Sequence, residues 1–176
     1  AAIAAAGDDF LLLWSDDQGV QSVTISPAGT VRSSSRLSNQ PESWDQIVLA
    51  SRGNSALAAW KPVNGPSLFA LGGPAQPFEL FDPHFGAWYP RKILPLADDR
   101  YLIVIQRHGV FWTSEITMSG AFITRIGEPR ALGRFPESVS RLSFATIGST
   151  PVVGFSDGPR GLIATSPRPR PRAVRR

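Results

Sequence analysis

Residues 1–14 read AAIAAAGDDFLLLW, and residues 47–60 read IVLASRGNSALAAW. Each stretch is an apolar run, a tight polar turn and a second apolar run that ends in tryptophan. The two tryptophans, Trp14 and Trp60, are 46 residues apart. Turns of Gly, Asn and Asp between β-prone runs predict β-hairpins. Arms that are apolar throughout are typical of strands buried on both faces, so we expect both tryptophans to pack between neighbouring sheets.

The same hairpin pattern occurs twice more along the chain. The third copy turns at Asp98-Asp99-Arg100 and the fourth at Gly148-Ser149-Thr150. A third extended run follows every hairpin, at residues 21–26, 67–71, 110–117 and 161–165. A fourth and more polar run follows in three copies, at residues 30–37, 77–80 and 122–132. The tripeptide Pro-Glu-Ser also recurs, at residues 41–43 and 136–138, which is a second signal of the same repeat.

Four strands per unit and a period of 46 to 50 residues predict an all-β, β-propeller-like fold. It would have four blade repeats of about four antiparallel strands, with the last blade incomplete. The predicted repeats are residues 1–45, 46–91, 92–140 and 141–165, followed by a Pro/Arg-rich tail at 166–176. Residues 1–6 are then an inner strand rather than the end of a leader. A β-sandwich is the alternative fold. The short last repeat is compatible with a small ring, with an open arc that a partner chain completes, or with a piece of a longer protein.

The hairpins that lead from Gly7-Asp8-Asp9 to Trp14 and from Gly53-Asn54 to Trp60 resemble bacterial β-propeller repeats of the Asp-box or BNR-like kind. The segment Ser15–Ser22 shares the Ser, Asp and Gly of an Asp-box but ends in serine where the motif has an aromatic residue. The resemblance covers residues 1–165 and implies a propeller architecture. It specifies no activity, because such folds include enzymes, lectins and scaffolds.

The charge of the chain is concentrated at one end. The formal net charge is +4, but five arginines lie in the last nine residues, and without them 13 basic residues remain against 14 acidic ones. The basic balance is therefore a property of the tail, and the sequence predicts no specific nucleic-acid binding by the fold itself. Cysteine is absent, lysine occurs only as Lys61 and Lys92, and Gly and Pro are plentiful. This composition favours an extracytoplasmic protein, periplasmic or secreted, and no apolar run predicts a transmembrane segment.

No residue pattern predicts catalysis, a metal site or a cofactor. The adjacent acids Asp8-Asp9, Asp16-Asp17 and Asp98-Asp99 lie at expected turns, and neighbours on a strand point to opposite faces. A sialidase-like site would need an arginine cluster and a Tyr–Glu pair, and the chain has only two tyrosines. The two histidines lack a recognised metal-ligand spacing.

Two segments remain as candidate contact elements. The first is the aromatic-rich loop at residues 78–89, which is longer than its counterparts in the other repeats, as binding loops of repeat proteins often are. The second is the tail, whose alternating Pro and Arg predict an extended strip that docks on an acidic protein surface or an anionic membrane surface. The predicted contact residues are Phe81, His84, Phe85, Trp88 and Tyr89 in the loop and Arg168, Arg170, Arg172, Arg175 and Arg176 in the tail.

These features predict a non-enzymatic interaction or scaffold subunit of a larger protein assembly. Two alternatives stay open: a carbohydrate-binding, lectin-like propeller, and a fragment of a larger propeller glycosidase. Packing of the loop aromatics against the core, and a merely solvated tail, are the structural alternatives to contact roles.

Overall fold

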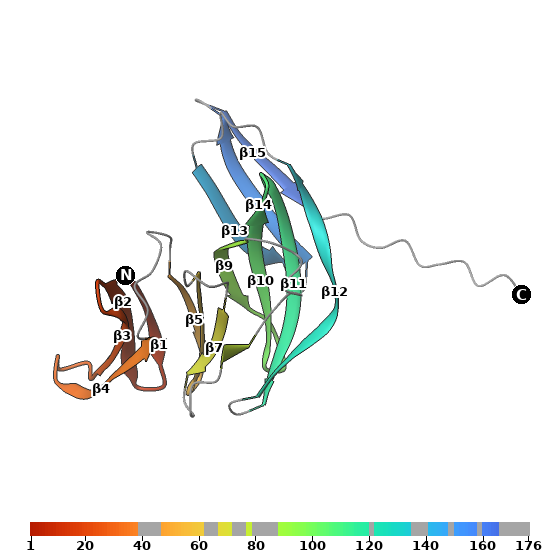
Figure 1. The fold of residues 1–176 in the computed structure, drawn as a ribbon. Helices are drawn as coiled ribbons and strands as arrows, with labels where there is room; N and C mark the ends of the chain where they lie inside the picture. Colours follow the sequence, from red (N-terminus) through yellow and green to blue (C-terminus); the bar gives the residue numbers. More distant parts are fainter. Residues whose placement is uncertain are drawn as a thin grey trace, which may run out of the picture. The chain divides into compact units, whose positions relative to one another are not determined.

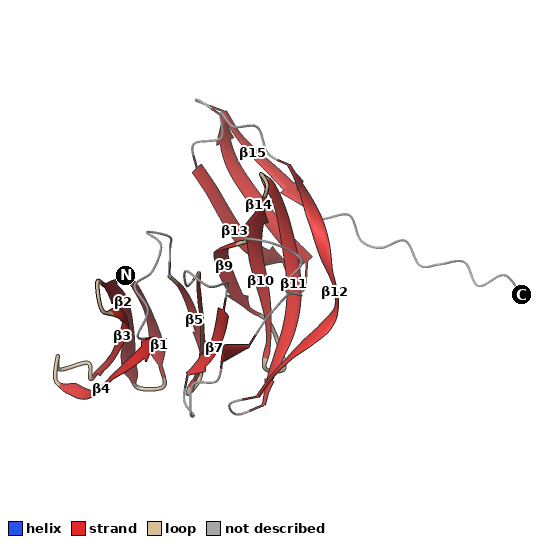
Figure 2. Ribbon diagram, viewed as in Figure 1, coloured by secondary structure: helices blue, strands red, loops and turns tan. Residues whose placement is uncertain are grey.

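The computed structural model describes residues 1–38, 47–61, 67–71, 77–78, 88–119, 122–134, 141–147, 150–157 and 160–165. Within these ranges every regular element is a β-strand (Figure 2). The all-β prediction is therefore confirmed. The strands form four separate antiparallel sheets, and none of the sheets closes on itself in the described ranges.

Each sheet is a meander, in which strands that are consecutive in sequence pair with each other (Figure 1). The first sheet contains β1 (Ala2–Ala6), β2 (Asp9–Asp16), β3 (Gly19–Ile25) and β4 (Val31–Ser38). The second contains β5 (Val48–Arg52), β6 (Ser55–Trp60), β7 (Ser67–Leu71) and β8 (Pro77–Phe78). The third contains β9 (Tyr89–Pro95), β10 (Arg100–Arg107), β11 (Val110–Ser119) and β12 (Phe122–Arg134). The fourth contains β13 (Arg141–Ile147), β14 (Thr150–Asp157) and β15 (Arg160–Thr165).

The chain divides into two compact units, Ala1–Arg134 with the first three sheets and Phe135–Arg176 with the fourth. The spacing of the hairpins is nearly constant across both units. On the second strand of each sheet, the residue that follows the hairpin turn is Asp9, Ser55, Arg100 or Thr150, which gives intervals of 46, 45 and 50 residues. We call this position the closing residue of the hairpin and use it to align the sheets.

The alignment defines two faces for every sheet, because successive side chains of a strand point to opposite sides. The front face carries the first, third and fifth residues after the closing residue, and the back face carries the second and fourth. On β6 the front face is Ala56, Ala58 and Trp60, and the back face is Leu57 and Ala59. All five of these residues are at most 2% exposed, so β6 is buried on both faces as the sequence predicted.

The first unit has two cores, and each lies between successive sheets. In the first core, Leu11, Leu13 and Val20 of the first sheet's back face pack with the front face of the second sheet. In the second core, Leu57 and Ala59 of the second sheet's back face pack with the front face of the third sheet. The third sheet's front-face members on β10 are Tyr101, Ile103 and Ile105. Within Ala1–Arg134, therefore, the back face of one sheet covers the front face of the next.

The first strand of the third sheet begins earlier than the sequence predicts. The sequence placed Tyr89 in a loop, but β9 begins at Tyr89. Two prolines, Pro90 and Pro95, lie in this strand and argued against it. They are tolerated because β9 is the edge strand of its sheet, where a missing N–H leaves no ladder hydrogen bond unmade. The pairing of β9 with β10 also shifts register beside Pro90.

Candidate functional site

The predicted aromatic loop is described by the structure only at its two ends, at Phe78 in β8 and at Trp88 and Tyr89. Trp88 is 1% exposed and packs in the second core with Ile93 and Tyr101. Its indole ring therefore packs in the core, which was the structural alternative to a role in binding a partner. Phe81, His84 and Phe85 lie outside the described residues, and their contact role stays a prediction. The same holds for the five tail arginines: Arg168, Arg170, Arg172, Arg175 and Arg176.

Tyr89 is half-buried and lies among cationic side chains. The Lys61 Nζ atom is 4.3 Å from the centroid of the Tyr89 ring, and the Arg91 Cζ atom is 5.8 Å from it. Arg91 also donates a hydrogen bond from Nε to Gln106 Oε1 at 2.8 Å. The Lys61–Tyr89 contact joins the ends of the second and third sheets, since Lys61 directly follows β6 and Tyr89 begins β9. Arg91 and Gln106 both belong to the third sheet. Cation–π pairs at partly exposed sites contribute about 0.5 to 1 kcal/mol, so the Lys61–Tyr89 contact stabilises the packing of the two sheets only modestly.

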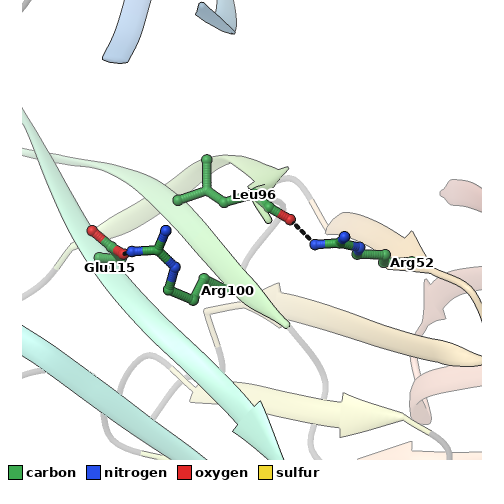
Figure 3. A network of polar contacts seen from close by, with 4 residues as sticks. All are labelled: Arg52, Leu96, Arg100 and Glu115. Carbon is green, nitrogen blue, oxygen red and sulfur yellow. Dashed lines mark hydrogen bonds and ion pairs between the residues drawn. The ribbon is translucent and has the colours of Figure 1, made fainter. Parts of the chain in front are cut away.

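At the opposite ends of these strands, polar contacts tie the first three hairpins together. The Gly7 N–H donates to the Gly53 carbonyl oxygen at 2.7 Å, which joins the first hairpin to the second. Arg52 Nη1 donates to the Leu96 carbonyl oxygen beside the third hairpin (Figure 3). Arg100 and Glu115 form an ion pair at 2.7 Å across β10 and β11, also drawn in Figure 3. The hairpin ends of the three sheets thus lie together within the first unit.

The acidic residues at the third turn serve the backbone conformation. Asp98 and Asp99 have φ angles of 55° and 53°, in the left-handed region that Asp tolerates better than most residues. The Asp99 carbonyl oxygen accepts a hydrogen bond from the Met118 N–H at 2.9 Å. Among the described residues, no group of three or more His, Asp or Glu side chains is placed to hold a metal ion. The turn geometry accounts for this acidic pair without a ligand.

The hydroxyl group of Tyr101 is expected to make the folded state less stable at alkaline pH. Burial raises the pKa of its hydroxyl above the usual 10.0, the Asp99 carboxylate raises this pKa further, and Arg52 opposes both. Because the folded state holds the proton more tightly than the unfolded state, this contribution to stability is complete below pH 10 and is lost as pH rises through the folded pKa.

We expect the free energy of unfolding to fall above pH 10. Urea denaturation at several pH values measures this fall, which Tyr101→Phe should reduce. In a Tyr89→Phe chain, absorbance near 295 nm then titrates Tyr101 alone; a midpoint at or below 10 would contradict the assignment.

Gly7 is required at the contact between the first two hairpins. Its φ is 63°, and a Cβ atom built there would lie 2.5 Å from Asn54 Oδ1. We expect Gly7→Ala to lower the free energy of unfolding by about 1 to 2 kcal/mol, because of the left-handed backbone and the displaced amide. Gly29→Ala is the matched control, since Gly29 has φ of 82° but no atom within 4 Å of the place that a Cβ atom would occupy. Chemical denaturation compares the two variants. Equal losses would show that the contact with Asn54 contributes nothing.

The front face of the first sheet is apolar and exposed. Ile3 is 63% exposed, Phe10 is 43% exposed and Val31 is 59% exposed. Cross-strand pairing places them on one face, since Ile3 pairs with Leu12, Phe10 with Ile25, and Ile25 with Val31. Leu12, Trp14 and Ile25 on the same face are partly exposed. We call the set Ile3, Ala5, Phe10, Leu12, Trp14, Ile25 and Val31 the apolar front face.

The prediction that both arms of every hairpin are buried on both faces is therefore wrong for the first sheet. Leu11 and Leu13 of β2 are buried, but Phe10 on the other side is not. The same difference separates the two tryptophans. Trp60 is fully buried between two sheets, as predicted, whereas Trp14 at the equivalent position is partly exposed. Sequence reasoning missed the apolar front face because its residues have the composition of a covered face.

In the parts of the chain that the structure describes, no helix is long and apolar enough to cross a membrane. No protein-family model matches the chain, and no curated protein is significantly similar to it. The candidate site therefore rests on the geometry alone, and its most distinctive element is the apolar front face.

Proposed function

We propose that the chain is a non-enzymatic interaction or scaffold subunit built from blade-type sheets of the β-propeller kind. The observation that carries this proposal is the apolar front face of the first sheet. A soluble protein rarely leaves so many large apolar side chains together in water, and such patches mark contacts with other molecules. The exposed Ile3, Phe10 and Val31 gain most from being covered, since burial of an aliphatic or aromatic side chain is worth about 1.5 to 3 kcal/mol.

The repeat geometry supports the propeller part of the proposal. Each of the first three sheets is a four-stranded meander, and the hairpins recur every 45 to 50 residues. In a propeller, sheets of this kind stack face to face with their first strands nearest the axis. Contacts of β1 with β5 and of β5 with β9 suit that arrangement, because these are the first strands of successive sheets. An extracytoplasmic location and contacts through the loop at 78–89 and the tail at 166–176 are further parts of the proposal.

The proposal is tested by charging the apolar front face. Phe10→Lys places an ammonium group on this face, and Phe122→Lys is the matched control, because Phe122 is 79% exposed on the outermost strand of another sheet. Tagged versions of the three chains are expressed in the native cell, and each retained protein is identified and purified. We expect at least one partner, or the chain itself, to bind the purified wild-type chain and the control equally and Phe10→Lys at least about tenfold more weakly. Equal binding to all three chains overturns the proposal. Specific binding on a glycan array would favour the carbohydrate-binding alternative.

A further inference from the structure

Equivalent positions of the four sheets differ in their exposure to solvent. The third residue after the closing residue points to the front in every sheet: Leu12, Ala58, Ile103 and Val153. Ala58 and Ile103 are 0% exposed and Val153 is 2% exposed, whereas Leu12 is partly exposed. The front face is thus buried at this position in every sheet except the first.

The back faces show the opposite pattern. The second residue after the closing residue points to the back: Leu11, Leu57, Leu102 and Val152. The three leucines are 8%, 0% and 6% exposed, but Val152 is partly exposed. On the same face of the fourth sheet, Ala145 is exposed and Ile147 is 72% exposed. Among the described residues at these positions, the partly or fully exposed ones therefore lie on the front face of the first sheet and on the back face of the fourth.

The sizes of the side chains make these two uncovered faces complementary. The second core packs the large front residues Tyr101, Ile103 and Ile105 against a back face of mostly smaller residues, which includes Ala50 and Ala59. The uncovered front face is also large, with Phe10, Leu12 and Trp14 at the equivalent positions. The centre of the back face of the fourth sheet is mostly small, with Ala145 at the position of Ala50 and Gly154 at the position of Ala59, while Ile147 lies at its hairpin end. Large residues facing small ones fill the space between two layers without voids.

We infer that the apolar front face of one copy binds the back face of the fourth sheet of a second copy. This inference rests on the proposed function, because it names the partner of the same face. It continues the sheet-on-sheet packing of residues 1–134, in which a back face covers the following front face. The contact is heterologous: the two copies contribute different surfaces, and the dimer keeps one free front face and one free back face unless the assembly closes.

The experiment uses the purified full chain alone, at a series of concentrations in the analytical ultracentrifuge. The wild-type chain is expected to associate, with a dimer as the first species above the monomer mass of 19.0 kDa. Ile3→Lys charges the front face and Ile147→Lys charges the back face, and each should weaken association at least about tenfold. Phe122→Lys, an exposed apolar residue of neither face, should leave association unchanged. Circular dichroism confirms that every variant folds.

Mixing the two charged variants tests the head-to-tail geometry. The Ile147→Lys chain keeps an intact front face and the Ile3→Lys chain keeps an intact back face, so an equimolar mixture should form a dimer that neither variant forms alone. If Ile3→Lys abolishes association but Ile147→Lys does not, two front faces pair with each other and the inference is overturned. A wild-type chain that stays monomeric at all concentrations also overturns it. In that case the proposed function stands if Phe10→Lys still loses a different protein partner, and it fails if no partner depends on this face.

Discussion

Replacement of Trp60 by alanine is expected to lower the free energy of unfolding by about 3 to 5 kcal/mol. Trp60 is 0% exposed and ends β6, where its side chain packs with Leu11, Leu13 and Val20 of the first sheet. Alanine would leave a cavity between two sheets, because the neighbouring front-face residues Ala56 and Ala58 are buried and too small to fill it. Urea denaturation followed by far-UV circular dichroism measures the change as a lower midpoint at a similar slope.

Trp14→Ala is the control for Trp60→Ala, because the two tryptophans hold the same position in their repeats. Trp14 lies on the apolar front face and is partly exposed, so its removal opens no closed cavity in the single chain. We expect a loss well below that of Trp60→Ala, and no more than about 1.5 kcal/mol. The comparison must be made at a concentration where the chain is monomeric, since Trp14 also belongs to the proposed contact surface. Equal losses would show that the front face of the first sheet is covered within one chain.

The positions of most strands were predictable because they depend on local patterns. Turns of Gly, Asn and Asp between apolar runs mark the ends of β1 and β2 and of β5 and β6, and the structure has hairpins there. The run predicted at residues 67–71 coincides with β7 (Ser67–Leu71). The start of β9 was not predictable in this way. Proline at residues 90 and 95 is unfavourable in a strand unless that strand lies at an edge, and edge position depends on distant pairing.

Burial of whole faces was only partly predictable, because it depends on which sheet packs against which. β2 and β6 have almost the same pattern of apolar residues, yet only β6 is covered on both sides. An apolar run shows that a strand can be buried and does not show whether a second sheet covers it. Trp88 illustrates the converse, since an aromatic residue in a long connection was predicted to be a contact residue and packs in the core instead.

The contacts between the hairpins had no sequence signature, because they use the backbone. The Gly7 N–H and the Gly53 carbonyl oxygen form one contact, and the Leu96 carbonyl oxygen accepts from Arg52 in the other. Every residue has a backbone carbonyl, and every residue except proline has a backbone N–H. The amino-acid type therefore does not reveal which backbone groups form a contact between hairpins. Only the left-handed conformations at Gly7 and Gly53 left a trace, as glycines at hairpin turns. The apolar front face became recognisable only when its burial could be compared with that of the equivalent faces.

Replacement of Ile103 by alanine is the second large effect that we expect, at about 2 to 5 kcal/mol. Ile103 is 0% exposed at the centre of the third sheet's front face, in the second core with Leu57. Ile103→Val removes one methyl group at the same place and should cost only about 0.5 to 1.5 kcal/mol. Thermal and urea denaturation of both variants measure the two losses. A loss of less than about 1 kcal/mol for Ile103→Ala would contradict the burial of this face.

Ile103→Val also tests whether the two cores are separate. Leu57 and Leu13 are both 0% exposed, but Leu57 shares the second core with Ile103 whereas Leu13 belongs to the first. Combined with Leu13→Ala, the loss from Ile103→Val should add within about 0.5 kcal/mol, because residues of different cores share no contacts. When Ile103→Val is combined with Leu57→Ala, the summed loss of unfolding free energy should deviate from additivity by at least about 0.5 kcal/mol. The reason is that the cavity left by Leu57 changes what the methyl group of Ile103 contacts. Equal deviations from additivity in both pairs would mean that the three sheets share one continuous core, in which the front and back faces of the second sheet are not separate.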